Sequence, residues 1–324
     1  MTEISRRHFN IGAATLALAG ASGGASAQAA YPAQDVHVIV GFAPGSGPDV
    51  IARFVMEKMR PHLKSVVIEN KPGAGGNIAS EYIARAKPDG YTLYLTGGSA
   101  LAASGSLFKK LPFDVIDDFE MVATLSRQPT LMVVGQNAPY KDIAGLTKGL
   151  KDKGAKASYG TAFPTARVLG KIYTDTIGAP AVEVQYRTSA DWINDLNAGH
   201  IDFGIIDAAS GATHAKNGRF RIVAVGTAER SAAMPEYPTL KSQGVDVDLP
   251  GWWCVYAPKG TPDAIKDKLH GWFTEVVQTD DVRKFLTGIA NEPFPLTRKE
   301  ASDYYVRDVK LWEKYVEIAQ IEKQ

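Results

Sequence analysis

The chain has 324 residues, of which 45% are hydrophobic and 22% are charged. This length is typical of about two domains, and the hydrophobic fraction is sufficient for a packed core. The 36 lysines and arginines nearly balance the 35 aspartates and glutamates, which argues against a charged surface for nucleic acid or for a membrane. Function must therefore depend on a local site.

The first 27 residues have the pattern of an export signal. Arg6 and Arg7 precede the short apolar stretch IGAATLALAGA, and the small-residue motif Ala25-Ser26-Ala27 follows. A charged start, a short apolar segment and an A-x-A site are typical of a signal peptide, and the paired arginines indicate twin-arginine export to the periplasm. The apolar stretch is shorter than the ~20 residues that span a bilayer. We therefore predict a signal peptide over 1–27, a mature chain from near Gln28 and no membrane insertion.

Cys254 is the single cysteine of the chain, so no internal disulfide can form. Its neighbours in GWWCVYAP are aromatic or apolar, whereas reactive thiols need a polar, electropositive setting. We predict a buried thiol with a structural role.

A strand, a turn and a helix follow one another near the start of the mature chain. The run VHVIVGF, residues 36–42, is almost wholly apolar, as in a parallel strand that is covered on both faces. Pro48 and Asp49 suit the first turn of a helix, where proline loses no hydrogen bond and a carboxylate meets the positive end of the helix dipole. Apolar residues then recur at helical spacing up to Pro61.

The same unit recurs along the chain, at 65–86 with a strand at 91–97, at 157–178 and at 182–207. Alternating strands and helices predict right-handed crossovers and parallel sheets. We therefore predict an α/β fold with two parallel-rich sheets.

Two longer β-like runs interrupt this alternation. Residues 121–135 contain Pro129, which favours a connecting or edge strand, and residues 251–260 form a second such run. The chain then becomes helical to its end. We predict two lobes joined by two crossover strands, with 28–126 and 255–324 in the first lobe and 127–254 in the second.

Local motifs for catalysis or metal binding are absent from the sequence. It contains no G-x-S-x-G, H-E-x-x-H, C-x-x-C or phosphate-binding G-x-x-x-x-G-K-[ST]. The histidines at 37, 62, 200, 214 and 270 are never four residues apart, the spacing of two metal ligands on one helix. Ser46 lies in a turn without a neighbouring histidine to activate it. We predict no enzyme activity, no metal and no cofactor.

Two turns between a strand and a helix have the composition of an anion site. Pro44–Asp49 and Gly160–Thr165 are rich in small and turn-forming residues, and helix N-termini at such turns present unpaired N–H groups and a positive dipole end. The alternative is that both are simple tight connections. Asp49 also has two interpretations, as a cap for its own helix or as a partner for a ligand's ammonium, hydroxyl or protonated group. The turn KPGAGGN, residues 71–77, lacks the glycine spacing of a dinucleotide site and is interpreted as a sharp turn.

Several longer segments together resemble one family. FAPGSGPDVIAR, ENKPGAGGNIASEYIARAKPDGYTLYL, LPFDVIDDFEMVA, VQYRTSADWINDLNAGHIDFGIID and VYAPKGTPDAI occur in this order over essentially the whole mature chain. They are similar to the substrate-binding receptors of tripartite tricarboxylate transporters, the Bug-type periplasmic solute-binding proteins. The resemblance implies a two-lobed periplasmic-binding-protein fold of the type II kind, with a carboxylate ligand in the cleft between the lobes. It also implies delivery of the ligand to a small and a large membrane subunit.

The resemblance further implies which residues line the cleft. In the family, backbone N–H groups of two opposed turns and ordered waters hold the ligand's carboxylate. Carried over to this sequence, the ligand-binding positions are Phe42, Pro44, Gly45, Ser46, Gly47, Pro48 and Asp49 in the first turn, Tyr159, Gly160, Thr161, Ala162, Phe163 and Thr165 in the second, and Ser99 and Asp207 as further cleft positions.

The second turn departs from the family pattern. It reads TAFPTAR, with Phe163 and Pro164 in place of flexible residues and with Arg167 one helical step beyond. A guanidinium can fork onto a carboxylate, so one hypothesis is that Arg167 binds a second carboxylate of the ligand. The rival hypothesis is that Phe163 stacks on an aromatic acid.

The sequence and the resemblance together predict a monomeric periplasmic receptor that captures a small carboxylic acid by lobe closure. The acid is a di- or tricarboxylate or an aromatic carboxylate. Two alternatives from other classes stay open. In one, the loaded receptor contacts the periplasmic domain of a sensor kinase, and in the other the protein is an enzyme that consumes the acid.

Overall fold

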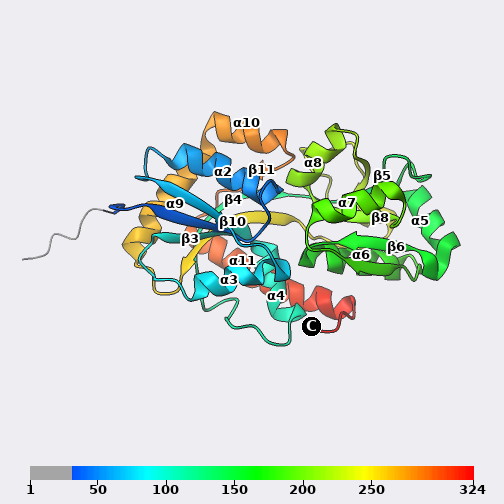
Figure 1. Ribbon diagram of the computed structural model, residues 1–324, viewed down its shortest axis with the longest axis horizontal. Coiled ribbons are helices and arrows are strands. Elements are labelled where there is room, and N and C mark those ends of the chain that lie inside the picture. The colour runs from blue at the N-terminus through cyan, green and yellow to red at the C-terminus, as the bar shows by residue number, and fades with distance from the viewer. Residues whose placement is uncertain (1–30) are drawn as a thin grey trace, which may run out of the picture. The chain divides into compact units, whose positions relative to one another are not determined.

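Two β-sheets organise the part of the chain that the computed structural model describes, residues 31–324 (Figure 1). Gln34–Gln324 form one structural unit. The predicted signal peptide, 1–27, lies outside the described residues.

The first sheet has six strands in the order β11-β4-β10-β3-β1-β2. Their bounds are β1 Val36–Val40, β2 Val66–Asn70, β3 Thr92–Gly97, β4 Phe119–Gln128, β10 Gly251–Pro258 and β11 Glu292–Pro293. Strands β2, β1 and β3 are parallel, whereas β10 runs antiparallel to β3 and to β4. Strand β1 is buried along almost its whole length, which agrees with its apolar sequence.

The second sheet has five strands in the order β7-β6-β8-β5-β9. Their bounds are β5 Thr130–Gly135, β6 Ser158–Thr161, β7 Val182–Gln185, β8 Phe203–Asp207 and β9 Phe220–Val225. Strands β7, β6 and β8 are parallel, and β5 is antiparallel to β8 and β9. The predicted α/β fold with two sheets is confirmed. Each sheet is mixed, because the strand that arrives from the other sheet runs opposite to the parallel core.

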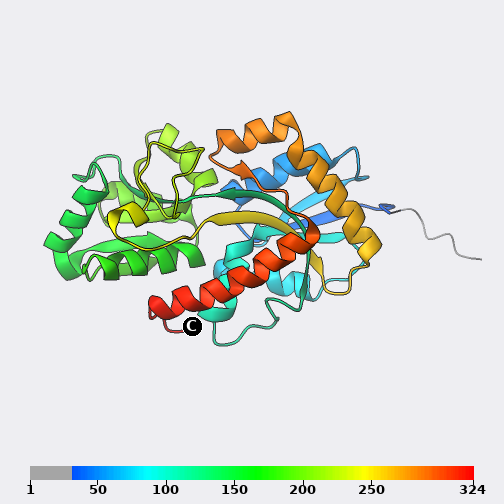
Figure 2. The ribbon, with the colours of Figure 1, turned by 180° about the vertical axis from the view of Figure 1, so that it is seen from behind.

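Helices cover both faces of each sheet (Figures 1 and 2). On the first sheet, α2 Gly47–Met59, α9 Asp263–Gln278 and α10 Asp280–Gly288 pack together, and α3 Asn77–Ala84, α4 Gly98–Leu107 and α11 Arg298–Ile318 form the other group. On the second sheet, α5 Ile143–Lys153 and α6 Pro164–Thr176 share one hydrophobic cluster, and α7 Ser189–Ala198 and α8 Ala208–Lys216 share the other. Both sheets therefore have buried faces, as parallel cores require.

The chain passes between the sheets twice. Strand β4 leads through Pro129 into β5, and the segment after β9 returns to β10 (Figure 2). The two passages are joined, because Thr130 Oγ1 donates to the Leu249 carbonyl at 2.9 Å and the Gly226 N–H donates to the Thr130 carbonyl at 2.8 Å. These are the two predicted crossovers. The lobe boundaries derived from the sequence stay a prediction.

Trp252 attaches the long helix α11 to the first sheet. Its indole N–H donates to the Asp308 carboxylate at 2.8 Å. Its ring leaves no space for a side chain at Gly98, where a Cβ would lie 2.1 Å from a ring carbon. Cys254 lies two residues further along β10, is fully buried and forms no disulfide, and burial raises the pKa of its thiol. The predicted structural thiol is confirmed.

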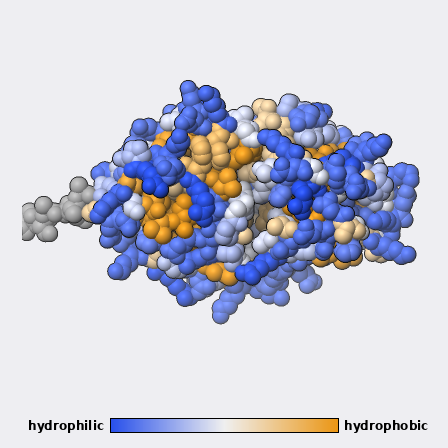
Figure 3. Space-filling model, turned by 45° about the horizontal axis from the view of Figure 1, so that its top comes forward, coloured by the Kyte–Doolittle hydropathy of each residue, from blue (hydrophilic) through white to orange (hydrophobic). Residues whose placement is uncertain are grey.

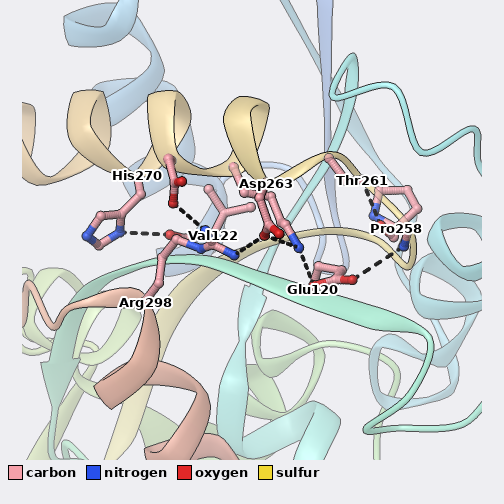
Figure 4. Close-up of polar contacts among 10 residues, drawn as sticks. Glu120, Val122, Pro258, Thr261, Asp263, His270 and Arg298 are labelled. Carbon is pink, nitrogen blue, oxygen red and sulfur yellow. Dashed lines mark hydrogen bonds and ion pairs between the residues drawn. The ribbon is translucent and has the colours of Figure 1, made fainter.

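A cluster of charged side chains fixes α9 to β4 and α11 (Figure 4). The Lys266 side chain is only 6% exposed and pairs with Glu120 at 2.6 Å and with Asp263 at 3.2 Å. Arg298, at the start of α11, pairs with the same Asp263 at 3.0 Å. Because these charges are paired with one another, the cluster has a structural role.

The surface shown in Figure 3 is largely hydrophilic and carries separate hydrophobic patches. Large exposed apolar side chains come from different elements, for example Ile78 of α3 and Val182 of β7. Within residues 31–324, no helix combines the length and the apolar character needed to cross a membrane.

Candidate functional site

A cavity of ≈ 360 Å³ is lined by residues from both sheets and from the helices that follow their strands. Its lining includes Phe42 after β1, Gly97 at the end of β3, Ala162 after β6 and Asp207 at the end of β8. These are the carboxyl ends of parallel strands, the edge at which ligands bind in α/β sheets. The volume is suitable for a small molecule.

A larger hollow of ≈ 1040 Å³ lies on the surface beside α3. Several of its polar side chains already have partners within the lining, since Arg85 pairs with Glu81 at 2.7 Å and the Lys71 ammonium lies 4.4 Å from the centre of the Tyr82 ring. Among the described helices, none begins with an N-cap residue in this lining. The cavity at the strand ends is therefore the better candidate site.

Six helices begin at the cavity. Their N-cap residues all line it: Ser46 of α2, Gly76 of α3, Gly97 of α4, Phe163 of α6, Thr188 of α7 and Asp207 of α8. The first N–H groups of a helix have no partner within the helix, and the helix dipole adds positive potential at this end. Six such ends at one cavity favour an anionic ligand.

These helix ends differ in whether their first N–H groups already have hydrogen-bond acceptors. At α7, Thr188 and Asp191 form a capping box, and at α8 the Asp207 carboxylate accepts the Ser210 N–H at 2.9 Å. Within residues 31–324, the N-cap residues of α2, α3, α4 and α6 form no side-chain cap, but at α2 the Gly47 N–H already donates to Ser210 Oγ at 2.8 Å. The ends of α3, α4 and α6 are therefore the ones at which a carboxylate can replace a cap.

Asp49 fixes the backbone of the first turn from a position outside the cavity lining. Its carboxylate accepts hydrogen bonds from the Gly45 N–H at 2.8 Å, from Arg53 at 3.0 Å and from Asn70 at 2.9 Å. Burial alone would raise the pKa of Asp49, but the hydrogen bonds from Arg53, Gly45 and Asn70 outweigh it and hold the pKa below its ordinary value. Asp49 is buried and does not line the cavity. This geometry supports the structural interpretation of Asp49.

Tyr159 and Gly160 lie behind the cavity surface, in the core of the second sheet. Tyr159 is buried and stacks on Phe203, with ring centroids 5.0 Å apart. A Cβ at Gly160 would lie 3.0 Å from the Trp192 side chain. Both residues therefore shape β6 and do not reach the cavity.

Arg167 and Thr161 both bind Glu183 of β7. Arg167 Nε lies 3.2 Å from Glu183 Oε2, and Thr161 Oγ1 donates to Oε1 at 2.7 Å. Neither residue lines the cavity. Because α6 begins at Pro164, Arg167 lies one turn into the helix and beside the edge strand. The hypothesis that Arg167 binds the ligand therefore receives no support from the geometry.

The remaining predicted positions are brought together at the cavity. They are Phe42, Pro44, Gly45, Ser46, Gly47, Pro48, Ser99, Ala162, Phe163, Thr165 and Asp207. Ser99 Oγ donates to the Pro250 carbonyl at 3.1 Å. Burial raises the pKa of Asp207 against the opposing effect of the Ser210 N–H. Their contacts with a ligand stay a prediction.

Residues 51–320 match the family described as "Tripartite tricarboxylate transporter family receptor". The chain belongs to this family. The resemblance found in its sequence segments is thereby confirmed, and members of the family are periplasmic solute-binding receptors.

The receptor is similar to curated and solved proteins over most of its length. A UPF0065 protein of Bordetella bronchiseptica is 34% identical over 248 residues, which cover 76% of this chain and 74% of the relative. The structure of R. palustris Rpa4515 with adipate has a TM-score of 0.86 at 26% identity, covering 91% of this chain and 100% of the other. MatC from Rhodopseudomonas palustris with bound malate has a TM-score of 0.81 at 25% identity, covering 88% and 100%.

The cavity of the receptor also contains a turn that the sequence analysis did not assign to the site. Gly73, Gly75 and Gly76 line it, with φ values of +134°, +65° and +102°. These left-handed angles confirm the sharp turn predicted for 71–77. The sequence alone could not assign this turn to the site, because the turn reaches the cavity only through the pairing of β2 with β1, which end at the same edge of the sheet.

Arg187, Thr188 and Ser189 form a second missed part of the lining, in the turn between β7 and α7. The sequence signal for it is the strand-turn-helix pattern of VEVQYRTSADW, which resembles that of the two turns assigned to the site. Among the residues that line the cavity, Arg187 is the one lysine or arginine. Within residues 31–324, no group of three or more His, Cys, Asp or Glu is arranged to hold a metal ion.

Aromatic side chains form an apolar wall of the cavity. Phe42 meets Trp253 edge to face, with ring centroids 5.8 Å apart, and Trp252 and Phe163 also line the space. An apolar wall beside unpaired N–H groups suits a molecule with a carbon chain and a charged end.

Proposed function

We propose that this receptor captures a small dicarboxylate in the periplasm and delivers it to the membrane subunits of a tripartite tricarboxylate transporter. The observation that carries the proposal is the convergence of six helix N-termini on one cavity. Rpa4515 was solved with adipate and MatC with malate, and both of these ligands are dicarboxylates.

One carboxylate of the ligand binds at the uncapped ends of α3, α4 and α6. A hydrogen bond to a charged group contributes roughly 1.5–3 kcal/mol. Several such bonds, reduced by the cost of association, are compatible with a free energy of about −8 kcal/mol, which corresponds to a micromolar dissociation constant. The aromatic wall at Phe42 and Trp253 packs against the carbon chain. The site thus binds its ligand without carrying out chemistry on it.

The predicted export signal over 1–27 and the family of the chain support a periplasmic site of action. Ligand binding from both sheets favours closure of the lobes, and the closed form then docks on the small and the large membrane subunit. A monomer suffices for this function, because the cavity is lined by one chain.

A thermal-shift screen of the mature protein against C3 to C9 mono-, di- and tricarboxylates and aromatic acids tests the proposal. A ligand at 100 times its dissociation constant adds about 2.7 kcal/mol of stability, which appears as a higher melting temperature. The matched control for adipate is adipamide, which has a similar shape and no charge. The proposal is wrong if the amide, an amine or a sugar stabilises the protein and no carboxylate does.

The enzyme alternative has a separate test. Proton NMR of a stabilising acid after long incubation with the protein is expected to show the acid unchanged. Conversion of the acid to a product would show that the cavity is an active site.

A further inference from the structure

Arg187 is a cationic side chain at the cavity that has no partner among residues 31–324. The residue is exposed, and within residues 31–324 it forms no hydrogen bond or ion pair. Two other arginines that flank the predicted turns are occupied, since Arg53 pairs with Asp49 at 3.0 Å and Arg167 pairs with Glu183 at 3.2 Å. Arg187 is therefore a guanidinium that a ligand can use.

The backbone on both sides of Arg187 is fixed. The Tyr186 N–H donates to the Thr161 carbonyl at 2.8 Å, which continues the pairing of β7 with β6. On the other side, the Thr188 N–H donates to the Asp191 carboxylate at 3.0 Å as part of the capping box of α7. A side chain on a fixed backbone loses less conformational entropy when it binds than one on a mobile loop.

The carboxylates nearest to Arg187 in the chain are bound to other donors, and Glu183 among them accepts from Arg167 at 3.2 Å and from Thr161 at 2.7 Å. Asp191 accepts from the Thr188 hydroxyl at 2.8 Å in addition to the N–H, and Asp195 accepts from the Tyr186 hydroxyl at 2.6 Å. Asp207, which shares the cavity lining, caps α8. None of these acids is paired with Arg187, so its positive charge remains available.

We infer that Arg187 binds the second carboxylate of the ligand and selects dicarboxylates over monocarboxylates. The inference rests on the proposed function, in which the uncapped helix ends hold the first carboxylate. A guanidinium presents two parallel N–H donors to a carboxylate, so the pair is both strong and directional. Arg187 thereby takes the role that the sequence suggested for Arg167.

Isothermal titration calorimetry with matched acids tests the inference. Adipate and hexanoate have the same number of carbons and differ in the second carboxylate, and succinate with butanoate and glutarate with pentanoate form the shorter pairs. Arg187→Met is expected to weaken binding of the preferred dicarboxylate about 10- to 100-fold and to leave the monocarboxylate of the same length nearly unchanged. Arg187→Lys keeps the positive charge but loses the two parallel N–H donors. Its affinity for the dicarboxylate is expected to lie between those of the wild type and Arg187→Met.

Arg167→Met is the matched control. It removes an arginine side chain from α6 that does not line the cavity, and it is expected to leave the ratio of dicarboxylate to monocarboxylate affinity as in the wild type. Because Arg187 is exposed and unpaired, Arg187→Met is expected to melt at the wild-type temperature without ligand. A large drop in that temperature contradicts the inference, because it would mean that Arg187 has a structural role.

The outcomes separate the inference from the proposed function. If the wild type binds dicarboxylates and Arg187→Met weakens both acids of a pair equally or neither of them, the inference is wrong and the proposed function stands. A wild type that prefers monocarboxylates contradicts the inference and the dicarboxylate part of the proposed function, and it leaves capture of a carboxylate standing. If the wild type binds no carboxylate, the proposed function fails and the inference fails with it.

Discussion

The Gly47 N–H donates a hydrogen bond of 2.8 Å to Ser210 Oγ. Gly47 begins α2, which covers the first sheet, and Ser210 lies in the first turn of α8, which covers the second. A Cβ at Gly47 would lie 2.5 Å from Asp207 Oδ1 and 2.7 Å from Ala209 Cβ. The two halves of the cavity therefore meet where the backbone of Gly47 packs against side-chain atoms at the start of α8, without space for one further carbon atom.

Gly47→Ala is expected to weaken ligand binding at least about tenfold. The added methyl group separates α2 from α8, and the helix ends then no longer reach the same carboxylate. The φ of Gly47 is not in the left-handed region, so alanine itself is tolerated by the backbone. Calorimetric titration of the carboxylate found in the thermal-shift screen measures the effect.

Gly271→Ala is the control for this substitution. Gly271 lies inside α9, where no atom is within 4 Å of an added Cβ. Alanine there is expected to stabilise the protein by up to about 1 kcal/mol, because glycine is a poor helix former, and to leave affinity unchanged. Wild-type affinity in Gly47→Ala would show that the contact between α2 and α8 is not needed for binding.

Asp49→Ala is expected to lower the free energy of unfolding by about 2 kcal/mol at neutral pH, because Gly45, Arg53 and Asn70 lose a buried acceptor. The pKa of Asp49 is lowered in the folded protein. Its contribution is therefore present above the ordinary value of 3.8 and is lost as the pH falls through the folded-state pKa. Urea unfolding between pH 3 and pH 7 measures both effects.

The control for Asp49 is Asp152→Ala, which removes an exposed carboxylate paired with Lys148 at four residues' distance. An exposed pair of this kind contributes little. If Asp49→Ala and Asp152→Ala have the same effect on stability, Asp49 does not hold the first turn.

Asp308 is expected to make stability depend on pH in the direction opposite to Asp49, and Asp308→Asn is expected to remove this dependence. Burial raises the pKa of Asp308 from 3.8 to about 6, in spite of the hydrogen bond from Trp252. Between these values the folded protein binds a proton that the unfolded chain has lost, so stability falls as the pH rises from about 4 to about 6. The loss amounts to at most about 3 kcal/mol, and the asparagine variant lacks it.

Asp303→Asn, on the same helix, provides the comparison for Asp308. Asp303 is exposed, and its pKa is lowered mainly by the hydrogen bond from Lys299. This variant is expected to keep the decline in stability between pH 4 and pH 6. Equal slopes for the wild type and Asp308→Asn would contradict the raised pKa.

Glu120→Ala is expected to destabilise the protein by up to about 3 kcal/mol, because it leaves the buried Lys266 ammonium with the exposed Asp263 as its remaining ionic partner. The double variant with Lys266→Met is expected to recover most of the loss, since no uncompensated charge remains. Neither residue lines the cavity, so ligand affinity is expected to stay unchanged. Chemical unfolding and calorimetry of the same samples separate the two effects, and an affinity loss would contradict the structural role of the cluster.

The sequence predicts local features of this fold well. Turn chemistry and helix spacing depend on neighbouring residues, and the segment around Gly45 and Asp49 forms the expected strand, turn and helix. Pro129 correctly marks the passage from one sheet to the other. The mixed character of the sheets could not be predicted, because the direction of β10 depends on where the chain returns from the second sheet.

The site is less predictable than the fold, because its parts are distant in sequence. Arg167 and Arg187 look alike from the sequence, and what distinguishes them is Glu183, which binds Arg167 across the edge of the second sheet. The glycine turn 72–76 reaches the cavity only because β2 lies beside β1. Pairings of this kind are set by tertiary packing, which one sequence does not reveal.

Two of the five tryptophans, Trp252 and Trp253, line the cavity. The emission of an indole depends on the polarity and packing of its surroundings, and a ligand in the cavity lies beside these two buried rings. The receptor thus contains its own optical reporter, and a shift in intrinsic fluorescence gives the kinetics of ligand capture without any label.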